Sequence, residues 1–472
     1  MQKKSQKIGK NGDFSMKKVA FHNLGCKVNS YELDGIQQNF QKAEYKIVDF
    51  AQKADVYVIN TCSVTNIADR KSRQMIHKAK KQNPEAVVVA LGCYVQAMDG
   101  DGSDPDIDIV IGNNLKSQTF EIVDEYIKNR GNDFSKTSDI HLLNLKEEQS
   151  YEEQRVENCN EHTRAFIKIQ DGCDQYCSYC IIPYVRGHIR SRRIEDIMAE
   201  IAGLTKAGYK EFVITGIHLS SYGIEETSYN EFAKTGRTNT SLLEVINAAS
   251  AIEGVERIRL GSLEPRLMTE EFLKGITSNE KVCPHFHLSL QSGCDSVLKR
   301  MNRHYTTDEF ERVVERIRSF YEHPAITTDV IVGFPGETEG EFERTREYLE
   351  KIKLYEVHLF KYSRRKGTVA DKMPDQLTDK EKSKRSGILL KGDERNRNDF
   401  AKWYVGKRVE ILLEDMEEIN GSEYMVGYTK NYVKCAVTLP EGESAAAMEG
   451  KIISAEGMSV EGIGTLLCRF KI

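Results

Sequence analysis

The chain has 472 residues, of which 39% are apolar and 29% are charged, and its formal net charge is −5. This length predicts about three domains with ordinary hydrophobic cores. The mild acidic balance excludes a chain that binds nucleic acid as a bulk polycation, and the absence of any run of about 18 apolar residues argues against a membrane span.

Residues 1–15 are rich in lysine and lack the apolar stretch of a secretory signal, so we expect a disordered tail there. The chain contains 11 cysteines. Without a secretory signal, this number favours a reducing, cytoplasmic location and metal or redox chemistry over disulfide bonds.

Residues 16–125 alternate apolar runs with polar stretches that are typical of helices. Three of the apolar runs are typical of buried strands: 19–24, 55–59 and 86–91. Continuous apolar strands separated by helices predict a doubly wound parallel sheet for this first domain.

A cysteine closely follows each of these three runs, at Cys26, Cys62 and Cys93. The carboxyl ends of parallel strands meet at one edge of a sheet, where α/β proteins bind ligands, so the three cysteines are expected to converge. A single cysteine after a strand would be an ordinary small buried residue. Three at matching positions favour a metal site built from three thiolates.

Residues 126–160 are polar and acidic, and they predict a linker or a loose surface connection. Residues 161–398 then repeat a strand and a helix six times. The predicted strands are 165–170, 211–216, 255–261, 285–290, 326–333 and 355–362. Six such units predict a partial barrel of six β/α repeats, with the functional site at the carboxyl ends of its strands.

The loop after the first of these strands contains Cys173, Cys177 and Cys180, spaced C-x3-C-x2-C with no fourth cysteine close by. Three thiolates can hold three irons of a four-iron cluster and leave the fourth iron open to a ligand. Structural zinc sites and ferredoxins are weaker alternatives, because both use four protein ligands. With Tyr179 just before the last cysteine, the spacing resembles the signature of the radical S-adenosylmethionine (SAM) superfamily.

Residues 399–472 are expected to form five short strands separated by glycine-containing turns. These strands are 407–413, 424–428, 431–438, 451–455 and 465–472. The pattern predicts a small β-barrel of the kind that binds oligonucleotides, and a purely structural barrel is an equal alternative.

Seven motifs along the chain resemble the radical SAM methylthiotransferases. They are residues 24–29, 60–65, 91–96, 173–180, 287–293, 329–337 and 427–433. In that family an N-terminal cluster domain precedes a radical SAM core and a C-terminal TRAM barrel, and the resemblance implies this division here. The sequences of the first two motifs are most similar to those of the branch that acts on threonylcarbamoyladenosine in bacterial tRNA.

The resemblance implies SAM and two four-iron, four-sulfur (4Fe–4S) clusters as cofactors. The three cysteines of the 173–180 loop would bind the cluster that cleaves SAM to a 5′-deoxyadenosyl radical. The three strand-end cysteines of the first domain would bind an auxiliary cluster that holds or delivers sulfur. Carbon 2 of adenine carries an unactivated C–H bond, so the reaction needs a radical route. No side chain is assigned a catalytic role.

Further residues of the cysteine loop and of the strand ends in the core are expected to contact SAM or the substrate. They are Tyr179, Thr215, Gly216, Ser262, Glu264, Gln291, Ser292 and Gly333. Each could equally be a turn or cap residue. Glycine at such a position permits a close approach of the backbone to a ligand.

The implied reaction adds a methylthio group to carbon 2 of N6-threonylcarbamoyladenosine, next to the tRNA anticodon. Isopentenyladenosine in tRNA or an aspartate of a ribosomal protein is the alternative substrate, and a non-catalytic iron–sulfur RNA-binding protein is the alternative class. The implied partners are the anticodon loop, whose unpaired bases leave their stack at low cost, and a reductant protein such as flavodoxin or ferredoxin.

Two places combine features that suit RNA. Arg364 and Arg365 follow the sixth strand of the core, while Tyr428, Lys430 and Tyr432 offer a charge beside rings on which bases can stack. A charge run is as often only a solvated face, so these residues are candidate RNA contacts and no more.

Overall fold

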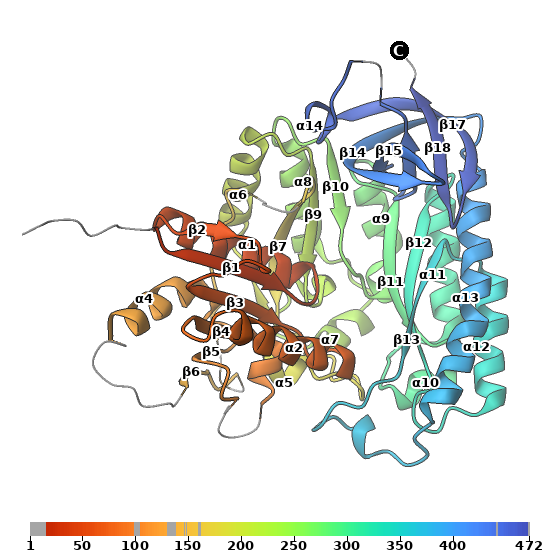
Figure 1. Ribbon diagram of the computed structural model, residues 1–472. Coiled ribbons are helices and arrows are strands. Elements are labelled where there is room, and N and C mark those ends of the chain that lie inside the picture. The colour runs from red at the N-terminus through yellow and green to blue at the C-terminus, as the bar shows by residue number, and fades with distance from the viewer. Residues whose placement is uncertain are drawn as a thin grey trace, which may run out of the picture.

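The structure is a computed structural model that describes residues 16–98, 104–129, 138–145, 147, 149–158, 162–439 and 442–470. The tail expected at residues 1–15 lies outside this range. Figure 1 shows the N-terminal sheet in red to orange beside β7, the core in green, and a β-rich C-terminal part in blue at the top. None of the helices in the described ranges has the length and apolar character to cross a membrane.

Six parallel strands form the N-terminal sheet in the order β2-β1-β3-β4-β5-β6. Their bounds are Lys18–Asn23 (β1), Lys46–Val48 (β2), Val56–Thr61 (β3), Val87–Gly92 (β4), Ile109–Ile111 (β5) and Asp139–His141 (β6). α1 (Lys27–Lys42) and α4 (Thr119–Asn129) pack on one face and α2 (Asn66–Gln82) on the other. Because both faces are covered, β3 and β4 are buried along their whole length. The predicted parallel sheet is confirmed.

The segment expected to be a loose linker is instead built into the fold. β6 completes one edge of the sheet. Beyond it, the Gln154 side chain donates to the backbone oxygen of Glu32 at 2.9 Å, and the backbone N–H of Val156 donates to buried Glu200. The polar side chains of this segment therefore hydrogen-bond across the boundary between the sheet and the core, a role that composition cannot distinguish from solvation.

The core contains six parallel strands in two sheets. The first sheet has β7 (Ala165–Asp171), β9 (Glu211–Gly216), β10 (Arg257–Leu260) and the short antiparallel β8 (Arg190–Ser191), and the second has β11 (His285–Gln291), β12 (Ala325–Val332) and β13 (Glu356–Lys361). Isolated parallel bridges join Ile258 to Val282 and Leu263 to Leu288 across the gap between β10 and β11. All six strands predicted for the core are present.

Helices follow the core strands and bury their apolar stripes against them. The longer ones are α6 (Ile194–Lys206), α8 (Thr240–Ala251), α9 (Glu270–Thr277), α11 (Thr307–Phe320), α12 (Glu339–Ile352) and α13 (Asp379–Lys402). The shorter ones are α5 (Ile182–Arg186), α7 (Tyr229–Lys234) and α10 (Asp295–Arg300). Capping boxes at Thr306, Thr338 and Thr378 fix where α11, α12 and α13 begin.

The C-terminal part is a closed five-stranded sheet in the order β14-β15-β16-β18-β17. The strands are β14 (Arg408–Ile419), β15 (Ser422–Tyr428), β16 (Lys434–Val437), β17 (Ile452–Glu461) and β18 (Thr465–Phe470), with the short α14 (Ala445–Met448) between β16 and β17. The boundary expected between residues 398 and 399 falls inside α13. Phe400 and Ala401, near the end of this helix, pack into the core of the closed sheet, so the helix belongs to both parts of the chain.

Two buried arginines of β10 dock this closed sheet on the core. Arg257 donates to the backbone oxygen of Tyr428 at 3.0 Å, and Arg259 donates to that of Lys430 at 3.0 Å. Glu211, also buried, accepts from Arg259 at 2.7 Å and so balances its charge. The contact fixes the loop between β15 and β16 against the inner side of the core strands.

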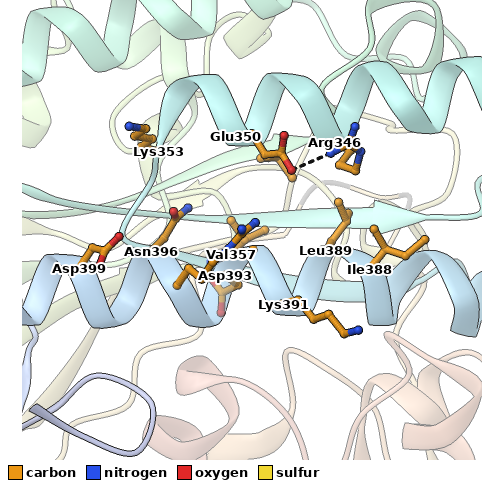
Figure 2. A pocket seen from close by; sticks show the side chains of 13 residues that line it. Arg346, Glu350, Lys353, Val357, Ile388, Leu389, Lys391, Asp393, Asn396 and Asp399 are labelled. Atoms are coloured by element: carbon orange, nitrogen blue, oxygen red, sulfur yellow. Dashed lines mark hydrogen bonds and ion pairs between the residues drawn. The ribbon is translucent and has the colours of Figure 1, made fainter.

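A cavity of about 740 Å³ lies on the outer side of the core, between α12, β13 and α13 (Figure 2). Its lining mixes paired charges, such as Arg346 with Glu350, and apolar side chains such as Ile388. Asp393 accepts the backbone N–H of Val357 at 2.6 Å, and burial raises the pKa of this carboxyl to about 6. None of the lining residues is a cysteine, so the cysteine chemistry lies elsewhere.

Candidate active site between two groups of cysteines

The three strand-end cysteines of the N-terminal sheet meet at one edge, as the strand order predicts. Cys26 follows β1, Cys62 follows β3, and Cys93 begins the short α3 (Cys93–Gln96) after β4. The Cys62 thiol has both other thiols as electrostatic neighbours. Gly25, with φ +136°, makes this approach possible, since a Cβ there would lie 3.3 Å from the Cβ of Cys62.

The second group of cysteines lies on the loop between β7 and α5. Burial raises the pKa of the Cys173 thiol well above its usual range, and the neighbouring thiols of Cys177 and Cys180 raise it further. Backbone N–H groups donate to Cys173 and Cys180. The Nη1 atom of Arg303 lies 3.2 Å from the sulfur of Cys177. This loop therefore gathers three thiols among donors that stabilise negative sulfur.

Both groups have the chemistry that an iron–sulfur cluster requires. In each group the proximity of the other thiols opposes ionisation: burial raises the pKa of Cys62 to about 11, and its neighbours Cys93 and Cys26 act in the same direction. A bound cluster of iron cations would offset that repulsion and hold the three sulfurs as thiolates. Each group offers three cysteines, so a four-iron cluster held there would have one iron without a cysteine ligand.

The two groups are neighbours in space. Cys180 and Cys93 are close enough to interact electrostatically. Asn113 spans the gap between them: its amide donates to the backbone oxygen of Val185 at 2.6 Å and lies 3.6 Å from the sulfur of Cys93. A single reaction could therefore use both groups of thiols in one place.

A cavity of about 210 Å³ opens beside both groups. Val64 and Thr65, which follow Cys62, line it from the N-terminal sheet, and Tyr179 lines it from the 173–180 loop. Gln291 and Asp329 line it from β11 and β12. A second cavity of about 340 Å³ is lined by residues adjacent to three of the cysteines, namely Ser63, Tyr94 and Ile181.

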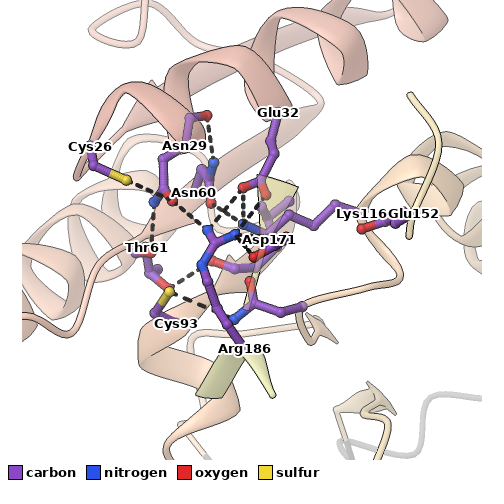
Figure 3. Close-up of polar contacts among 12 residues, drawn as sticks. Cys26, Asn29, Glu32, Asn60, Thr61, Cys93, Lys116, Glu152, Asp171 and Arg186 are labelled. Atoms are coloured by element: carbon purple, nitrogen blue, oxygen red, sulfur yellow. Dashed lines mark hydrogen bonds and ion pairs between the residues drawn. The ribbon is translucent and has the colours of Figure 1, made fainter. Parts of the chain in front are cut away.

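A buried ionic network beneath the cysteines joins the N-terminal sheet to the core (Figure 3). Glu32 of α1 pairs with Lys116, with Lys168 of β7 at 2.8 Å and with Arg186 of α5 at 2.9 Å. Figure 3 shows the side chain of Arg186 passing Cys93 and ending at Glu32 and Asp171. Burial alone would raise the pKa of Glu32, but the three cations outweigh it and hold this pKa well below its usual range.

The structure brings together only some of the residues expected to contact SAM or the substrate. Tyr179 and Gln291 line the 210 Å³ cavity. Thr215 is buried and Gly216 partly buried at the end of β9, and Ser262 is exposed after β10. Ser292 instead faces Thr345 of α12, and the N–H of Gly333 donates to Glu337 at 2.8 Å, so these two positions serve the packing of α12 and α13.

Glu264 is the remaining expected contact, and it is buried. Its carboxylate accepts from Tyr229 at 3.1 Å and from Arg266 at 2.7 Å. It also caps the backbone N–H of Arg266. With these three protein donors, Glu264 is a cap residue in this structure, which is the alternative that the sequence left open for it.

All five expected RNA contacts have partners inside the protein. Arg365 is buried and bonds to the Ser63 backbone and to Asp69 at 2.8 Å, so it clamps the turn after Cys62. Lys430 donates to the backbone oxygen of Glu280 at 3.1 Å. Only Arg364 stays at the surface, where it pairs with Asp371 at 2.9 Å.

Tyr428 and Tyr432 are also held between domains. Their rings stack with centroids 4.8 Å apart, and Tyr432 stacks on His285 of β11 at 4.7 Å. The guanidinium of Arg164 lies over both tyrosine rings. The structure therefore gives these two rings a docking role, because sequence alone does not show which partners a tyrosine meets across an interface.

Sequence reasoning missed several residues that shape the site. Arg303, Asn113 and Arg186 each act on a thiol or its loop from a distant place in the chain. None lies in a metal-binding spacing, so no local signal identifies them. Arg186 follows the cysteine loop as one basic residue among several, and only its burial in the fold reveals its partners.

Two family models match the chain: residues 18–112 match Uncharacterized protein family UPF0004, and residues 167–349 match the Radical SAM superfamily. The threonylcarbamoyladenosine tRNA methylthiotransferase MtaB of Bacillus subtilis (strain 168) is 40% identical over 93% of this chain and 94% of its own. The chain belongs to the radical SAM methylthiotransferase family. As a radical SAM protein it uses a 4Fe–4S cluster and SAM.

Other members of the family match over similar lengths. MtaB of Aquifex aeolicus (strain VF5) is 39% identical over 86% of this chain and 95% of its own. A tRNA-2-methylthio-N(6)-dimethylallyladenosine synthase of Clostridium botulinum (strain Langeland / NCTC 10281 / Type F) is 31% identical over 93% of this chain and 95% of its own. This methylthiotransferase thus resembles two branches of the family over nearly its whole length.

Among solved structures, the radical SAM methyltransferase TsrM from Kitasatospora setae, with cobalamin and a [4Fe-4S] cluster bound, superposes with a TM-score of 0.52. The alignment covers 75% of this chain and 74% of that chain at 13% identity. A likeness at this identity concerns the fold alone.

Proposed function

We propose that this methylthiotransferase adds a methylthio group to carbon 2 of N6-threonylcarbamoyladenosine, next to the anticodon of tRNA. The observation that carries the proposal is the placement of two three-cysteine groups beside one cavity, with Cys180 and Cys93 as neighbours. The choice of nucleoside rests on relatives of that name at 40% and 39% identity, against 31% for the dimethylallyladenosine synthase.

In this proposal Cys173, Cys177 and Cys180 hold the radical SAM cluster. That cluster, when bound, supplies the electron that cleaves SAM and so yields the radical that removes hydrogen from carbon 2. Arg303 donates to the sulfur of Cys177 at 3.2 Å and would help to balance the charge of the bound cluster. Tyr179 and Gln291 border the cavity and would orient the adenosyl part of SAM and the substrate base.

Cys26, Cys62 and Cys93 would hold the auxiliary cluster, which would supply the sulfur to be transferred. Arg365 fixes the turn that carries Cys62, and the Glu32–Arg186 network fixes the N-terminal sheet against the core. These contacts hold the two groups of thiols in a constant relative position. Positioning of this kind is the main contribution that a protein makes to a radical reaction carried by cofactors.

The division into functional parts is also proposed here. Residues 16–125, extended by β6 at the sheet edge, would form the cluster domain, residues 161–398 the radical SAM core as a partial six-stranded barrel, and residues 399–472 a TRAM barrel that contacts RNA, with α13 crossing the last boundary. Near the cavity, Phe360 is exposed and Lys361 lies beside it, so this edge offers a ring and a charge to an extruded base. Arg364 adds a surface cation. A protein reductant such as flavodoxin or ferredoxin would deliver the electron.

The test is a comparison of two tRNAs. The enzyme is reconstituted anaerobically with iron and sulfide and given SAM, a reductant, and tRNA that carries either threonylcarbamoyladenosine or isopentenyladenosine. Nucleoside analysis should find the methylthio product from the first tRNA, with kcat/KM at least about tenfold higher than for the second, a difference of about 1.4 kcal/mol. Preference for the isopentenyl tRNA would move the chain to the other branch. Deoxyadenosine without either nucleoside product would place the substrate outside tRNA.

A further inference from the structure

Helix α2 begins directly beside the 210 Å³ cavity and runs from there over the N-terminal sheet (Figure 1). Val64 and Thr65, which precede the helix, line this cavity. The backbone N–H of Asn66 donates at 2.9 Å to Ser363 of the core, which lines the cavity as well. With 17 residues at about 1.5 Å each, α2 extends about 25 Å from the cavity.

One face of α2 is buried and the opposite face is rich in cations. The buried residues Ser72, Ile76 and Ala79 are spaced as on one side of a helix, and they turn that side toward the sheet. The exposed face, here called the basic stripe, consists of Arg70, Lys71, Gln74, Lys78 and Lys81. The helix contains six lysines and arginines and one aspartate, a balance of +5 in a chain whose net charge is −5.

Three cations of the basic stripe are not neutralised within the protein. Among the residues that the structure describes, no hydrogen bond, ion pair or ring contact engages the side chains of Arg70, Lys71 and Lys81. The acids that reach α2 from the segment before β5 are already paired: Asp106 lies 2.6 Å from His77, and Asp108 lies 2.6 Å from Lys80. A row of free cations on one exposed face attracts a partner with a row of negative charges.

The end of α2 at the cavity is apolar instead. Val64 is 54% exposed and Ile67 is 52% exposed, while Phe360 of β13 is 43% exposed on the core side of the cavity. Val64 and Phe360 both line the cavity. Exposed apolar side chains at a cavity suit a base that has left its stack, because they replace part of the lost stacking. Apolar groups at the cavity and cations leading away from it fit a ligand with one extruded base and a charged backbone.

We propose that the basic stripe of α2 binds the phosphate backbone of the anticodon stem-loop and presents its extruded base to the cavity between Val64 and Phe360. This inference rests on the proposed function. Phosphate contacts fix the orientation of a nucleic acid, so the stripe would act as a positioning surface. An acidic reductant protein is the other polyanion of suitable charge. The position of the stripe beside the substrate cavity favours RNA, and the experiment separates the two.

The first experiment measures tRNA affinity with the full-length, reconstituted enzyme. The test variant removes the three free cations by Arg70→Gln, Lys71→Gln and Lys81→Gln. The control variant makes the same change of charge at three exposed lysines of α6 and α13, by Lys206→Gln, Lys391→Gln and Lys402→Gln. Binding of tRNA that carries threonylcarbamoyladenosine is titrated between about 0.05 and 0.2 M salt. Iron content and deoxyadenosine formation without tRNA report whether each variant is intact.

The loss of three phosphate contacts should weaken tRNA binding about 100-fold at about 0.1 M salt. The plot of log affinity against log salt should become less steep by about two, since each contact to a phosphate of single-stranded nucleic acid contributes about 0.7. The control variant should keep the wild-type affinity and slope. Both variants should keep the wild-type rate of deoxyadenosine formation with dithionite as the reductant.

The second measurement needs no variant. A lysine-acetylating reagent is applied to the wild-type enzyme with and without tRNA, and mass spectrometry measures the modification of each lysine. Bound tRNA should remove most of the labelling of Lys71 and Lys81. Labelling of Lys206 and Lys391 should not change.

Equal affinity and slope for the test and control variants, together with unprotected Lys71 and Lys81, would overturn the inference. If the test variant binds tRNA normally but is reduced more slowly by reduced flavodoxin, and not by dithionite, the stripe binds the reductant protein instead and the inference is wrong. If the wild type forms deoxyadenosine but no methylthio nucleoside from this tRNA, the proposed function fails. That result comes from the wild type alone and is distinct from the affinity of the variants.

Discussion

Replacement of Cys173, Cys177 and Cys180 by alanine is expected to abolish formation of 5′-deoxyadenosine. The three thiols lie on one loop, where backbone N–H groups donate to Cys173 and Cys180 and Arg303 donates to Cys177. Without them no iron is held beside Tyr179, and SAM has no open iron to bind. Iron should fall from about eight atoms per chain to about four, because each cluster contains four.

The matched control is Cys468→Ala, which removes a buried cysteine of the C-terminal closed sheet. It should keep the full iron content and the wild-type rate of deoxyadenosine formation, apart from a modest loss of stability. Deoxyadenosine formation by the triple variant at a rate near that of wild type would mean that another site cleaves SAM.

Glu32→Gln is expected to destabilise the folded protein by about 3–5 kcal/mol, the usual cost of breaking a buried ion pair. Glu32 is almost fully buried, and its removal leaves Lys116, Lys168 and Arg186 with fewer anions around them. α1 begins directly after Cys26, and Glu32 ties this helix to Lys168 and Arg186 of the core. Loss of these pairs should therefore loosen the N-terminal sheet against the core. Urea unfolding followed by tyrosine fluorescence measures the loss.

The same variant changes the response to acid. The pKa of Glu32 is held well below its usual range in the folded protein, so its stabilising effect is fully present above about pH 4.3 and is lost progressively as the pH falls from there through the depressed folded-state pKa. The stability difference between wild type and Glu32→Gln should therefore be constant near pH 7 and shrink only in strong acid, well below pH 4. The control is Glu157→Gln at an exposed pair, which should change stability by less than about 1 kcal/mol. A Glu32 variant as stable as this control would contradict a structural role for the network.

The sequence predicts the site well where one rule of chain geometry applies. Parallel strands end at a common edge, so cysteines after three successive apolar runs converge, and Cys26, Cys62 and Cys93 are found near one another. The C-x3-C-x2-C spacing is local and needs no knowledge of the fold. The six strands of the core could be predicted as well, because each is a local apolar run in the sequence.

What the sequence could not predict depends on partners far along the chain. Arg365 and Tyr432 are residue types typical of an RNA-binding surface. In the fold, however, Arg365 pairs with Asp69 and Tyr432 stacks on His285, both of which are more than a hundred residues away in the sequence. The polar segment 149–158 looked like a linker because hydrogen bonds across an interface use the same side chains as solvent does. β2, β5 and β6 have three residues each, too few to show a period.

The central claim is that the two groups of cysteines divide the reaction, one for radical formation and one for sulfur transfer. The most direct test is the variant in which Cys26, Cys62 and Cys93 are all alanine, with deoxyadenosine and methylthio nucleoside measured in one reaction on threonylcarbamoyl tRNA. The account predicts about four irons per chain, continued deoxyadenosine formation and no methylthio nucleoside. Methylthio nucleoside formed at the wild-type rate would contradict a role for these cysteines in sulfur transfer, and complete loss of deoxyadenosine would contradict the division of labour.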